Sequence, residues 1–321
     1  GESTNPGADH ALMQVRVGLN AVIVAVTQDT PRVLTVDWSD LAQAVQQASS
    51  DTVAALPFGD LDAEGDRTLE LALRRWVRQQ TGLELGYGEQ LYSFGDRFRD
   101  PRESVAGVRV LSIAYLALVR EAAIPPSIPA VWRNVYDFLP WEDWRSGEPR
   151  ELMSRIAQGL APWLRGGDGQ RRLRYQMTFG IEAGAWSGNR VLERYELLYE
   201  AGLVQESQPD LTPWLGLPMA LDHRRMLATA LARVRGKLRY RPVIFELLPE
   251  EFTLLQLQKA AEALAGVAVH KQNFRRLVEQ GGLVEGTGRQ TRSVGRPAEL
   301  FRFRHEVLGE RPAPGVGLPR M

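Results

Sequence analysis

Five acidic side chains lie close together in one short stretch of the chain, where they could serve as ligands of a divalent cation. The stretch is residues 59–82, GDLDAEGDRTLELALRRWVRQQTG, and its acids are Asp60, Asp62, Glu64, Asp66 and Glu70. Magnesium prefers carboxylate oxygens, and in metal-assisted hydrolysis it stabilises charge on a diphosphate and activates water. The same acids could instead solvate a loop and a helix N-terminus, where negative charge is favourable. We favour the second interpretation, because the rest of the helix carries no acid after Glu70.

The second half of this stretch, residues 75–83, resembles the Nudix box, which holds metal and a nucleoside diphosphate in Nudix hydrolases. The family pattern ends in Arg-Glu-apolar-any-Glu-Glu-any-Gly-apolar, and the arginine, the apolar positions and the glycine are kept here. The carboxylate positions hold Trp76, Gln79 and Gln80, and the upstream one holds Arg67. Glutamine offers only a neutral oxygen, and Arg67 would place a cation where the metal sits. The resemblance therefore implies a Nudix fold with no catalytic residues, no metal site and no enzyme activity.

The elements around the box fit such a domain. Two long apolar runs, at 16–26 and 108–119, are typical of strands buried on both faces. Thr68 is a suitable N-cap for the helix between them. Trp76 falls on the apolar face of that helix, and we favour a core position for it over stacking on a ligand, because an aromatic side chain on an apolar stripe is usually core.

The segment after the box narrows the resemblance. A strand at 89–96, an Arg-Asp-Pro-Arg turn at 99–102 and a strand at 112–118 are similar to the Nudix domains of the NrtR and NadQ regulators of NAD metabolism. Arginines in this turn could bind phosphates, or could lie in a solvated loop with an Arg99–Asp100 ion pair. The resemblance implies a nucleotide effector, ADP-ribose, NAD or ATP, and no other cofactor. We expect effector contacts from Phe58, Arg67, Arg75, Arg97, Arg99 and Arg102.

Residues 125–220 are rich in tryptophan and mostly helical in pattern. A dense aromatic cluster comprises Trp132, Tyr136, Phe138, Trp141 and Trp144. Aromatic side chains bury large areas and dominate cores and interfaces. We therefore expect a helical insertion that packs on the Nudix domain or on a second subunit, in preference to a ligand cage. The shorter NrtR proteins lack such a region, and the longer NadQ-like proteins are similar to it.

A linker helix is predicted at 221–240. Asp222 is a plausible N-cap, and the cations at the far end of this helix are favourable against its dipole. His223 could be taken for a catalytic base, but no nucleophile and no metal-ligand spacing accompany it. We expect a structural role at the helix start.

Residues 241–308 show the pattern of a winged helix. Thr253 and Gln256 form a capping box, the first helix stops at Gly266, and a second helix runs from 270 to 280. A glycine-rich turn and an alternating strand at 300–304 complete a two-stranded ribbon. In a winged helix the second helix lies in the DNA major groove, and the ribbon can touch the backbone or minor groove.

Positive charge is concentrated in this part of the chain. From His270 to His305 there are eight Lys and Arg residues against three Glu, whereas the whole protein has a formal net charge of zero. Such a local excess is the electrostatic signature of a DNA-binding face, although some winged helices bind proteins instead. The residues expected at DNA are Lys271, Gln272, Asn273, Arg275 and Arg276 on the helix, and Arg289, Arg292 and Arg296 on the wing.

The whole chain sets further limits. Its 321 residues are enough for about two domains, and the absence of cysteine excludes disulfides and thiolate chemistry and fits a reducing cytoplasm. No apolar run reaches membrane-spanning length. The predicted fold class is α+β with several domains: a Nudix α/β/α sandwich, a helical Trp-rich insertion and a C-terminal winged helix-turn-helix domain. The predicted ranges are 1–12 (disordered), 13–124 (Nudix-like), 125–220 (Trp-rich), 221–240 (linker helix), 241–308 (winged helix) and 309–321 (tail).

The resemblance covers about 15–122 and 222–305 and implies a repressor of NAD biosynthesis genes. Its expected partners are a double-stranded DNA operator and a nucleotide, with no membrane, and it is expected to act as a homodimer because protein symmetry mirrors operator symmetry. One alternative is a Nudix hydrolase of a nucleoside diphosphate derivative with an accessory winged helix. Another is a winged-helix adaptor for protein interactions.

Overall fold

The computed structural model describes residues 14–38, 53–86, 88–97, 99–100, 103–104, 107–181, 186–291, 297–310 and 315–316. The segment 1–12 that we expected to be disordered lies outside these ranges, as do Arg102, Arg292, Arg296 and most of the expected tail. None of the helices within these ranges is both long enough and apolar enough to cross a membrane.

A seven-stranded mixed sheet is the centre of the first domain in the described part of the chain. Its strands are β1 (Val15–Thr27), β2 (Thr30–Asp37), β3 (Ala54–Ala55), β4 (Phe58–Asp60), β5 (Gly88–Phe94), β6 (Arg109–Leu118) and β7 (Ala130–Asn134). They follow the order β3-β2-β1-β6-β5, with β4 paired to β1 and β7 paired to β2. The long central strands β1 and β6 run parallel in continuous register, and the other recorded pairs are antiparallel.

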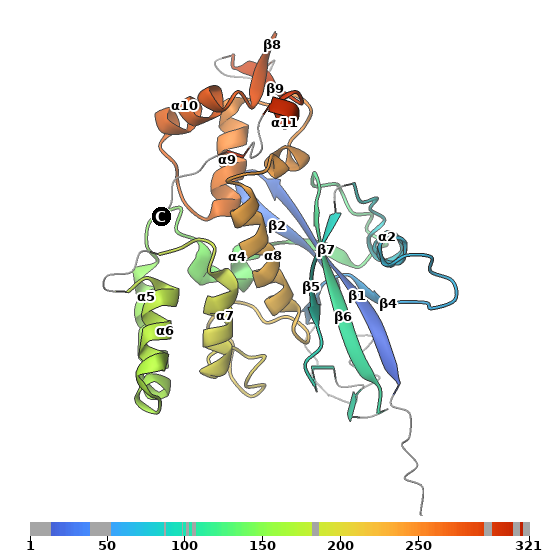
Figure 1. Ribbon diagram of the computed structural model, residues 1–321, viewed down its shortest axis with the longest axis vertical. Coiled ribbons are helices and arrows are strands. Elements are labelled where there is room, and N and C mark those ends of the chain that lie inside the picture. The colour runs from blue at the N-terminus through green and yellow to red at the C-terminus, as the bar shows by residue number, and fades with distance from the viewer. Residues whose placement is uncertain are drawn as a thin grey trace, which may run out of the picture.

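Strand β1 is buried on both faces, as its continuous apolar run predicts. Alternate residues face helix α2 (Leu69–Thr81) on one side of the sheet and helix α8 (His223–Lys237) on the other, which Figure 1 shows on opposite sides of the strands. The residues packed on the α2 side include Leu19, Ala21, Ile23, Ala72, Leu73 and Val77. Those on the α8 side include Val22, Val24, Leu116, Met226 and Leu227. The sheet thus lies between helices as in the predicted α/β/α sandwich, but the second helix is α8, which comes from the segment predicted as a linker and not from residues 13–124.

The tryptophan-rich middle is mostly helical but begins with a strand. β7 pairs with β2, with Trp132 opposite Leu34, and so extends the first sheet beyond the proline-rich boundary at 125–129. Valine and tryptophan favour a pleated, half-buried surface, which explains why this short piece forms a strand before the helices begin. The helices are α4 (Val135–Phe138), η2 (Pro140–Glu142), α5 (Arg150–Arg165), α6 (Gly169–Phe179) and α7 (Val191–Glu200).

The aromatic cluster of this region is largely core. Tyr136, Phe138 and Trp141 are buried, and Trp144 stacks on Trp186 with ring centroids 4.3 Å apart. These buried side chains belong to the same hydrophobic core as one face of the sheet and as α8. The region therefore packs against the first domain and the linker helix of its own chain.

The C-terminal domain has the helix, turn, helix and ribbon order expected of a winged helix. A short helix η3 (Val243–Leu247) leads to α9 (Leu254–Ala265) and α10 (Lys271–Gly281), which are followed by β8 (Val284–Gln290), β9 (Glu299–Phe303) and α11 (Val307–Glu310). β8 and β9 form an antiparallel ribbon. Figure 1 shows this domain at one end of the molecule, beyond the C-terminal end of α8.

Candidate effector site and nucleic-acid interface

Helix α2 carries the box residues, and its ends are set by local chemistry. The Thr68 side chain accepts a hydrogen bond from the Leu71 N–H at the N-cap, as expected, and the helix ends at Gly82 with φ of 73°. Only glycine adopts this left-handed conformation without strain. The helix thus presents Trp76 and Gln80 to the segment 58–60, which is strand β4.

Gln80 holds helix α2 to strand β4 by two hydrogen bonds to one residue. Its Oε1 accepts from the Phe58 N–H at 3.0 Å, and its Nε2 donates to the Phe58 carbonyl at 2.6 Å. A glutamate at this position could accept but could not donate while ionised. The amide at the former carboxylate position therefore has a structural function that a carboxylate cannot perform.

Trp76 also contacts β4. Its indole N–H donates to the Asp60 carbonyl at 2.9 Å, and its ring lies over Gly59. A Cβ atom on residue 59 would come within 2.0 Å of the ring, so glycine is required for this approach. Trp76 is half-buried, and its ring packs between Gly59 and Arg75 outside the cluster of core side chains that α2 forms with the sheet. The core position favoured from the sequence is therefore not confirmed.

The acids near the box bind arginines. Asp66 accepts from Arg75 at 2.7 Å, and these hydrogen bonds lower the pKa of the Asp66 carboxyl and raise the pKa of Arg75. Glu70 pairs with Arg74 at 2.7 Å one turn along the helix. Within the described residues no three His, Asp or Glu side chains are grouped closely enough to hold a metal ion. The side chains at the box positions therefore do not fit the magnesium site of a Nudix hydrolase.

The six predicted effector residues are in different environments. Arg67 and Arg97 are exposed, and Arg102 is outside the described ranges. Phe58 is half-buried beside Trp38, with ring centroids 4.7 Å apart. Arg75 is bound to Asp66 and lies over the Trp76 ring. Arg67, Arg97 and the Phe58–Trp38 pair thus remain candidates for a nucleotide, and Trp38 was not singled out from the sequence.

Arg99 is not in a solvated loop. Its Nε and Nη2 donate to the two carboxylate oxygens of Asp222 at 2.7 and 2.5 Å, and its Nη1 donates to the Ser112 hydroxyl at 2.9 Å. Asp222 is at the N-cap position of α8, as predicted, but its carboxylate bonds Arg99 and makes no capping hydrogen bond. A buried, bidentate arginine is a stronger partner than a helix N–H group. The sequence separation of 123 residues gave no signal for this pair.

His223 has the structural role expected of it. The ring is fully buried, its Nδ1 accepts from the Leu56 N–H at 3.0 Å, and its Nε2 lies 3.0 Å from the side-chain amide of Asn20. Burial lowers the pKa of His223 to about 4. A neutral ring that accepts at Nδ1 carries its proton on Nε2, and this proton can bond the Asn20 amide only through the amide oxygen, so the Asn20 amide must be turned with its oxygen toward the ring. In that arrangement the histidine joins α8 to β1 and to the residue before Pro57.

The predicted recognition helix presents its polar side chains to solvent. The capping box of Thr253 and Gln256 is present at the start of α9, and Gly266 ends that helix with φ of 73°. In α10, Phe274 and Val278 are buried and Leu277 is half-buried, which fixes the helix against the domain. The opposite face is exposed and consists of Lys271, Gln272, Asn273, Arg275 and Arg276. These side chains are of the types that bind phosphates and read base edges.

The wing carries further charge. Arg289 is exposed near the end of β8 and pairs with Glu251, and Arg302 pairs with Glu285 across the ribbon at 2.5 Å. The other two predicted wing contacts, Arg292 and Arg296, lie outside the described residues. The described wing thus offers Arg289 as a candidate DNA contact, in addition to the exposed face of α10.

Comparison with known proteins identifies the C-terminal domain and one relative of most of the chain. Residues 244–303 match the family model of the NrtR DNA-binding winged helix domain. A curated relative, the "ADPR responsive transcriptional repressor NtrR" of Acinetobacter baylyi, is 26% identical over 249 residues, which cover 78% of this chain and 69% of that protein.

Solved structures show that the fold is shared over most of the chain. NrtR of Shewanella oneidensis, in a crystal structure with a 27mer DNA, matches with a TM-score of 0.53 at 22% identity and covers 91% of this chain and 95% of its own. A MutT/nudix family protein from Enterococcus faecalis matches with a TM-score of 0.52 at 16% identity, and the match covers 91% of this chain and 87% of that protein. The predicted resemblance to the NrtR type is confirmed: the chain has the fold of NrtR, and its C-terminal residues 244–303 match the model of the NrtR winged helix domain.

Proposed function

We propose that the chain is a DNA-binding transcriptional repressor of NAD biosynthesis genes, whose Nudix-like domain senses a nucleotide. The observation that carries this proposal is the match of residues 244–303 to the NrtR DNA-binding domain, together with the exposed polar face of α10. Lys271, Gln272, Asn273, Arg275 and Arg276 contact the operator, and the wing arginines Arg289, Arg292 and Arg296 contact its backbone.

ADP-ribose is the first choice among the possible effectors. The relative from A. baylyi is named for its response to ADP-ribose. NAD and ATP contain the same adenosine and phosphate groups, and they remain the alternatives. In our proposal Arg67 and Arg97 bind the phosphates by charge-assisted hydrogen bonds, and an aromatic ring at Phe58 and Trp38 contacts the base.

The proposed regulator does not hydrolyse its effector. Gln80 and Trp76 are engaged in holding α2 to β4, and Asp66 and Glu70 are paired with arginines. We infer that the domain keeps the nucleotide-binding fold while the metal chemistry of the box is lost. As a regulator of this kind the protein acts in the cytoplasm, as a homodimer on a two-fold symmetric operator.

The test is a titration of fluorescent duplexes taken from upstream of NAD biosynthesis genes. Binding is followed by anisotropy at several salt concentrations, with and without ADP-ribose, NAD and ATP, and with a scrambled duplex as control. Specific, salt-dependent binding that one nucleotide changes, with the nucleotide recovered intact after incubation with Mg²⁺, is the expected result. Consumption of nucleotide without specific DNA binding would identify a hydrolase. If the protein neither binds the duplexes specifically nor consumes nucleotide, the adaptor hypothesis is the one that stands.

A further inference from the structure

Helix α8 is held at both ends by buried contacts, at the first domain and at the winged helix. It has fifteen residues, which corresponds to a length of about 22 Å. Figure 1 shows it running along the sheet toward the winged helix. A helix fixed at two distant points is a rigid element, so a displacement at one end reaches the other.

The N-terminal attachment of α8 is the Arg99–Asp222 pair. The two side chains are 3% and 8% exposed, and they share two parallel hydrogen bonds. Arg99 is held in turn by the Ser112 hydroxyl on β6. Because a bidentate pair fixes angle as well as distance, the segment that carries Arg97 and Arg99 and the start of α8 must move together.

The next residue adds a second attachment at the same end. His223 accepts from the Leu56 N–H, and Leu56 lies two residues before Phe58, which Gln80 clamps to the box helix. The first turn of α8 therefore contacts both segments from which we draw the nucleotide site, the one with Arg97 and the one with Phe58.

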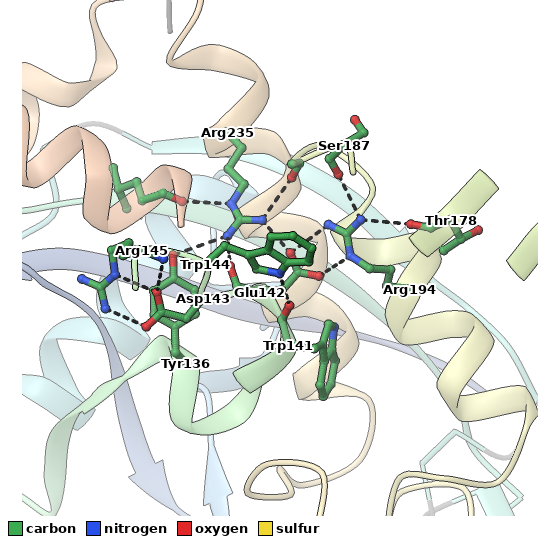
Figure 2. A network of polar contacts seen from close by, with 12 residues as sticks. Tyr136, Trp141, Glu142, Asp143, Trp144, Arg145, Thr178, Ser187, Arg194 and Arg235 are labelled. Atoms are coloured by element: carbon green, nitrogen blue, oxygen red, sulfur yellow. Dashed lines mark hydrogen bonds and ion pairs between the residues drawn. The ribbon is translucent and has the colours of Figure 1, made fainter. Parts of the chain in front are cut away.

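The C-terminal attachment involves the last turn of α9. Arg235 donates from Nε to the Leu264 carbonyl at 3.0 Å and from Nη1 to Glu142 at 2.6 Å, while Tyr136 donates to the Ala263 carbonyl at 2.5 Å. Figure 2 shows the guanidinium groups of Arg235 and Arg194 meeting at Glu142.

The fit at this end leaves no room for a side chain at the end of α9. A Cβ atom on Gly266 would lie 2.4 Å from Arg235 Nη2. Because packing is this close, the orientation of α8 sets that of α9, and α10 follows α9 directly.

We propose that α8 transmits nucleotide binding to the winged helix, and that the Arg99–Asp222 pair is its joint on the sensor side. This inference rests on the proposed function. Arg99 is then a positioning residue and not a phosphate ligand: its guanidinium is already occupied by Asp222 and Ser112, whereas Arg97, two residues earlier, is exposed. A diphosphate bound at Arg97 displaces this segment, and the pair passes the displacement to α8.

The test compares the coupling between ADP-ribose and operator DNA in the wild-type protein and in Asp222→Asn. The coupling factor is the ratio of the operator Kd values with and without saturating ADP-ribose, and factors of about 5 to 150 are typical of allosteric proteins. We expect Asp222→Asn to bind each ligand alone about as tightly as the wild type but to lose most of the coupling. The same loss must be seen in the Kd for ADP-ribose with and without operator, because coupling is reciprocal.

Two further variants make the result decisive. Ser112→Ala removes one support of Arg99 without leaving an unpaired charge, and it should lower the coupling by a smaller factor. Glu84→Gln breaks the exposed Arg78–Glu84 pair elsewhere in the same domain and should keep the wild-type coupling. Full coupling in folded Asp222→Asn and Ser112→Ala would overturn the inference. If the wild type itself binds no operator or no nucleotide, it is the proposed function that fails.

Discussion

Gln80 and Phe58 bind each other in both directions across the interface of helix α2 and strand β4. The Phe58 N–H donates to Gln80 Oε1 at 3.0 Å, and Gln80 Nε2 donates to the Phe58 carbonyl at 2.6 Å. Phe58 is the first residue of β4, which pairs with β1 at the centre of the sheet. A position that holds a metal-binding carboxylate in the Nudix pattern has thus become part of the scaffold.

Restoring the carboxylate should therefore cost stability without restoring catalysis. In Gln80→Glu the donor to the Phe58 carbonyl is lost and two acceptors face each other in a half-buried site. We expect the free energy of unfolding to fall by about 1–3 kcal/mol, the cost of leaving such a group unsatisfied. Urea unfolding followed by tryptophan fluorescence measures the change, and incubation with ADP-ribose and Mg²⁺ should give no product.

The neighbouring glutamine provides a matched control. Gln79 is exposed on the same turn of α2, so Gln79→Glu should change the free energy of unfolding by less than about 0.5 kcal/mol. Equal stability of the two variants would show that the clamp contributes nothing. Mg²⁺-dependent turnover by Gln80→Glu would contradict the prediction, because it would show that one restored carboxylate is enough for hydrolysis.

The exposed face of α10 predicts a defect in DNA binding. Arg275→Ala removes a cation one turn after the start of the helix, and we expect it to weaken operator binding by roughly 5- to 100-fold, as for loss of a phosphate or base contact. If the contact is to phosphate, binding weakens on all duplexes and the salt dependence becomes shallower. If the contact is to a base, the loss is confined to duplexes that carry that base. Anisotropy titrations at three salt concentrations, on operator and scrambled duplexes, distinguish a phosphate contact from a base contact.

The control for this variant is an exposed arginine far from the winged helix. Arg172 on α6 is exposed, and Arg172→Ala should leave operator affinity and its salt dependence unchanged. Unchanged affinity in Arg275→Ala would mean that α10 does not lie at the DNA.

Local patterns in the sequence predicted the elements and their ends. Thr68, the Thr253–Gln256 capping box and Gly266 act within one helical turn of themselves, so a single sequence specifies them. Burial on both faces of β1 follows from its apolar run in the same way. The change of residue types in the box could also be seen without a structure.

Long-range polar partners could not be predicted. Arg99 and Asp222 are 123 residues apart, and the sequence offered Asp100 as the nearer partner of Arg99 and helix N–H groups as the nearer donors to Asp222. Glu142, Arg194 and Arg235 come from three segments whose approach depends on how the Trp-rich region folds back on α8. Arginine is usually exposed, and tertiary packing decides which arginines become buried. No local sequence pattern indicates it.

The buried histidine predicts a pH dependence of stability. Burial lowers the pKa of His223 to about 4 in the folded protein, from an ordinary value of 6.5, and the neighbouring Asp222 and Arg99 shift it in opposite directions. Because the pKa of His223 is lower in the folded protein than in the unfolded chain, the unfolded chain takes up a proton first as the pH falls below 6.5. The free energy of unfolding is therefore highest above pH 6.5 and decreases as the pH falls toward 4. The shift corresponds to about 3 kcal/mol.

The comparison with His223→Gln isolates this contribution from the carboxyl groups that titrate in the same range. The variant should be less stable than the wild type at pH 7.5, because its link from α8 to Leu56 and Asn20 is altered. The difference between the two proteins should shrink by about 3 kcal/mol between pH 7 and pH 4 in urea titrations. A constant difference over that range would show that His223 does not titrate on unfolding.

The buried carboxylate of Glu142 predicts the largest loss of stability. Burial by itself would raise the pKa of Glu142, but Arg194 and Arg235 outweigh it, and the pKa lies below its usual value. Glu142→Gln leaves two buried guanidinium groups without a counter-charge, and breaking a buried pair in this way costs about 3–5 kcal/mol. Urea unfolding followed by tryptophan fluorescence reports this site directly, because Trp186 lies against Arg194 and stacks on Trp144.

Glu148→Gln, which breaks the exposed Arg150–Glu148 pair, should change the stability by less than about 0.5 kcal/mol. If Glu142→Gln were as stable as Glu148→Gln, the three-residue network would not hold the winged helix to α8.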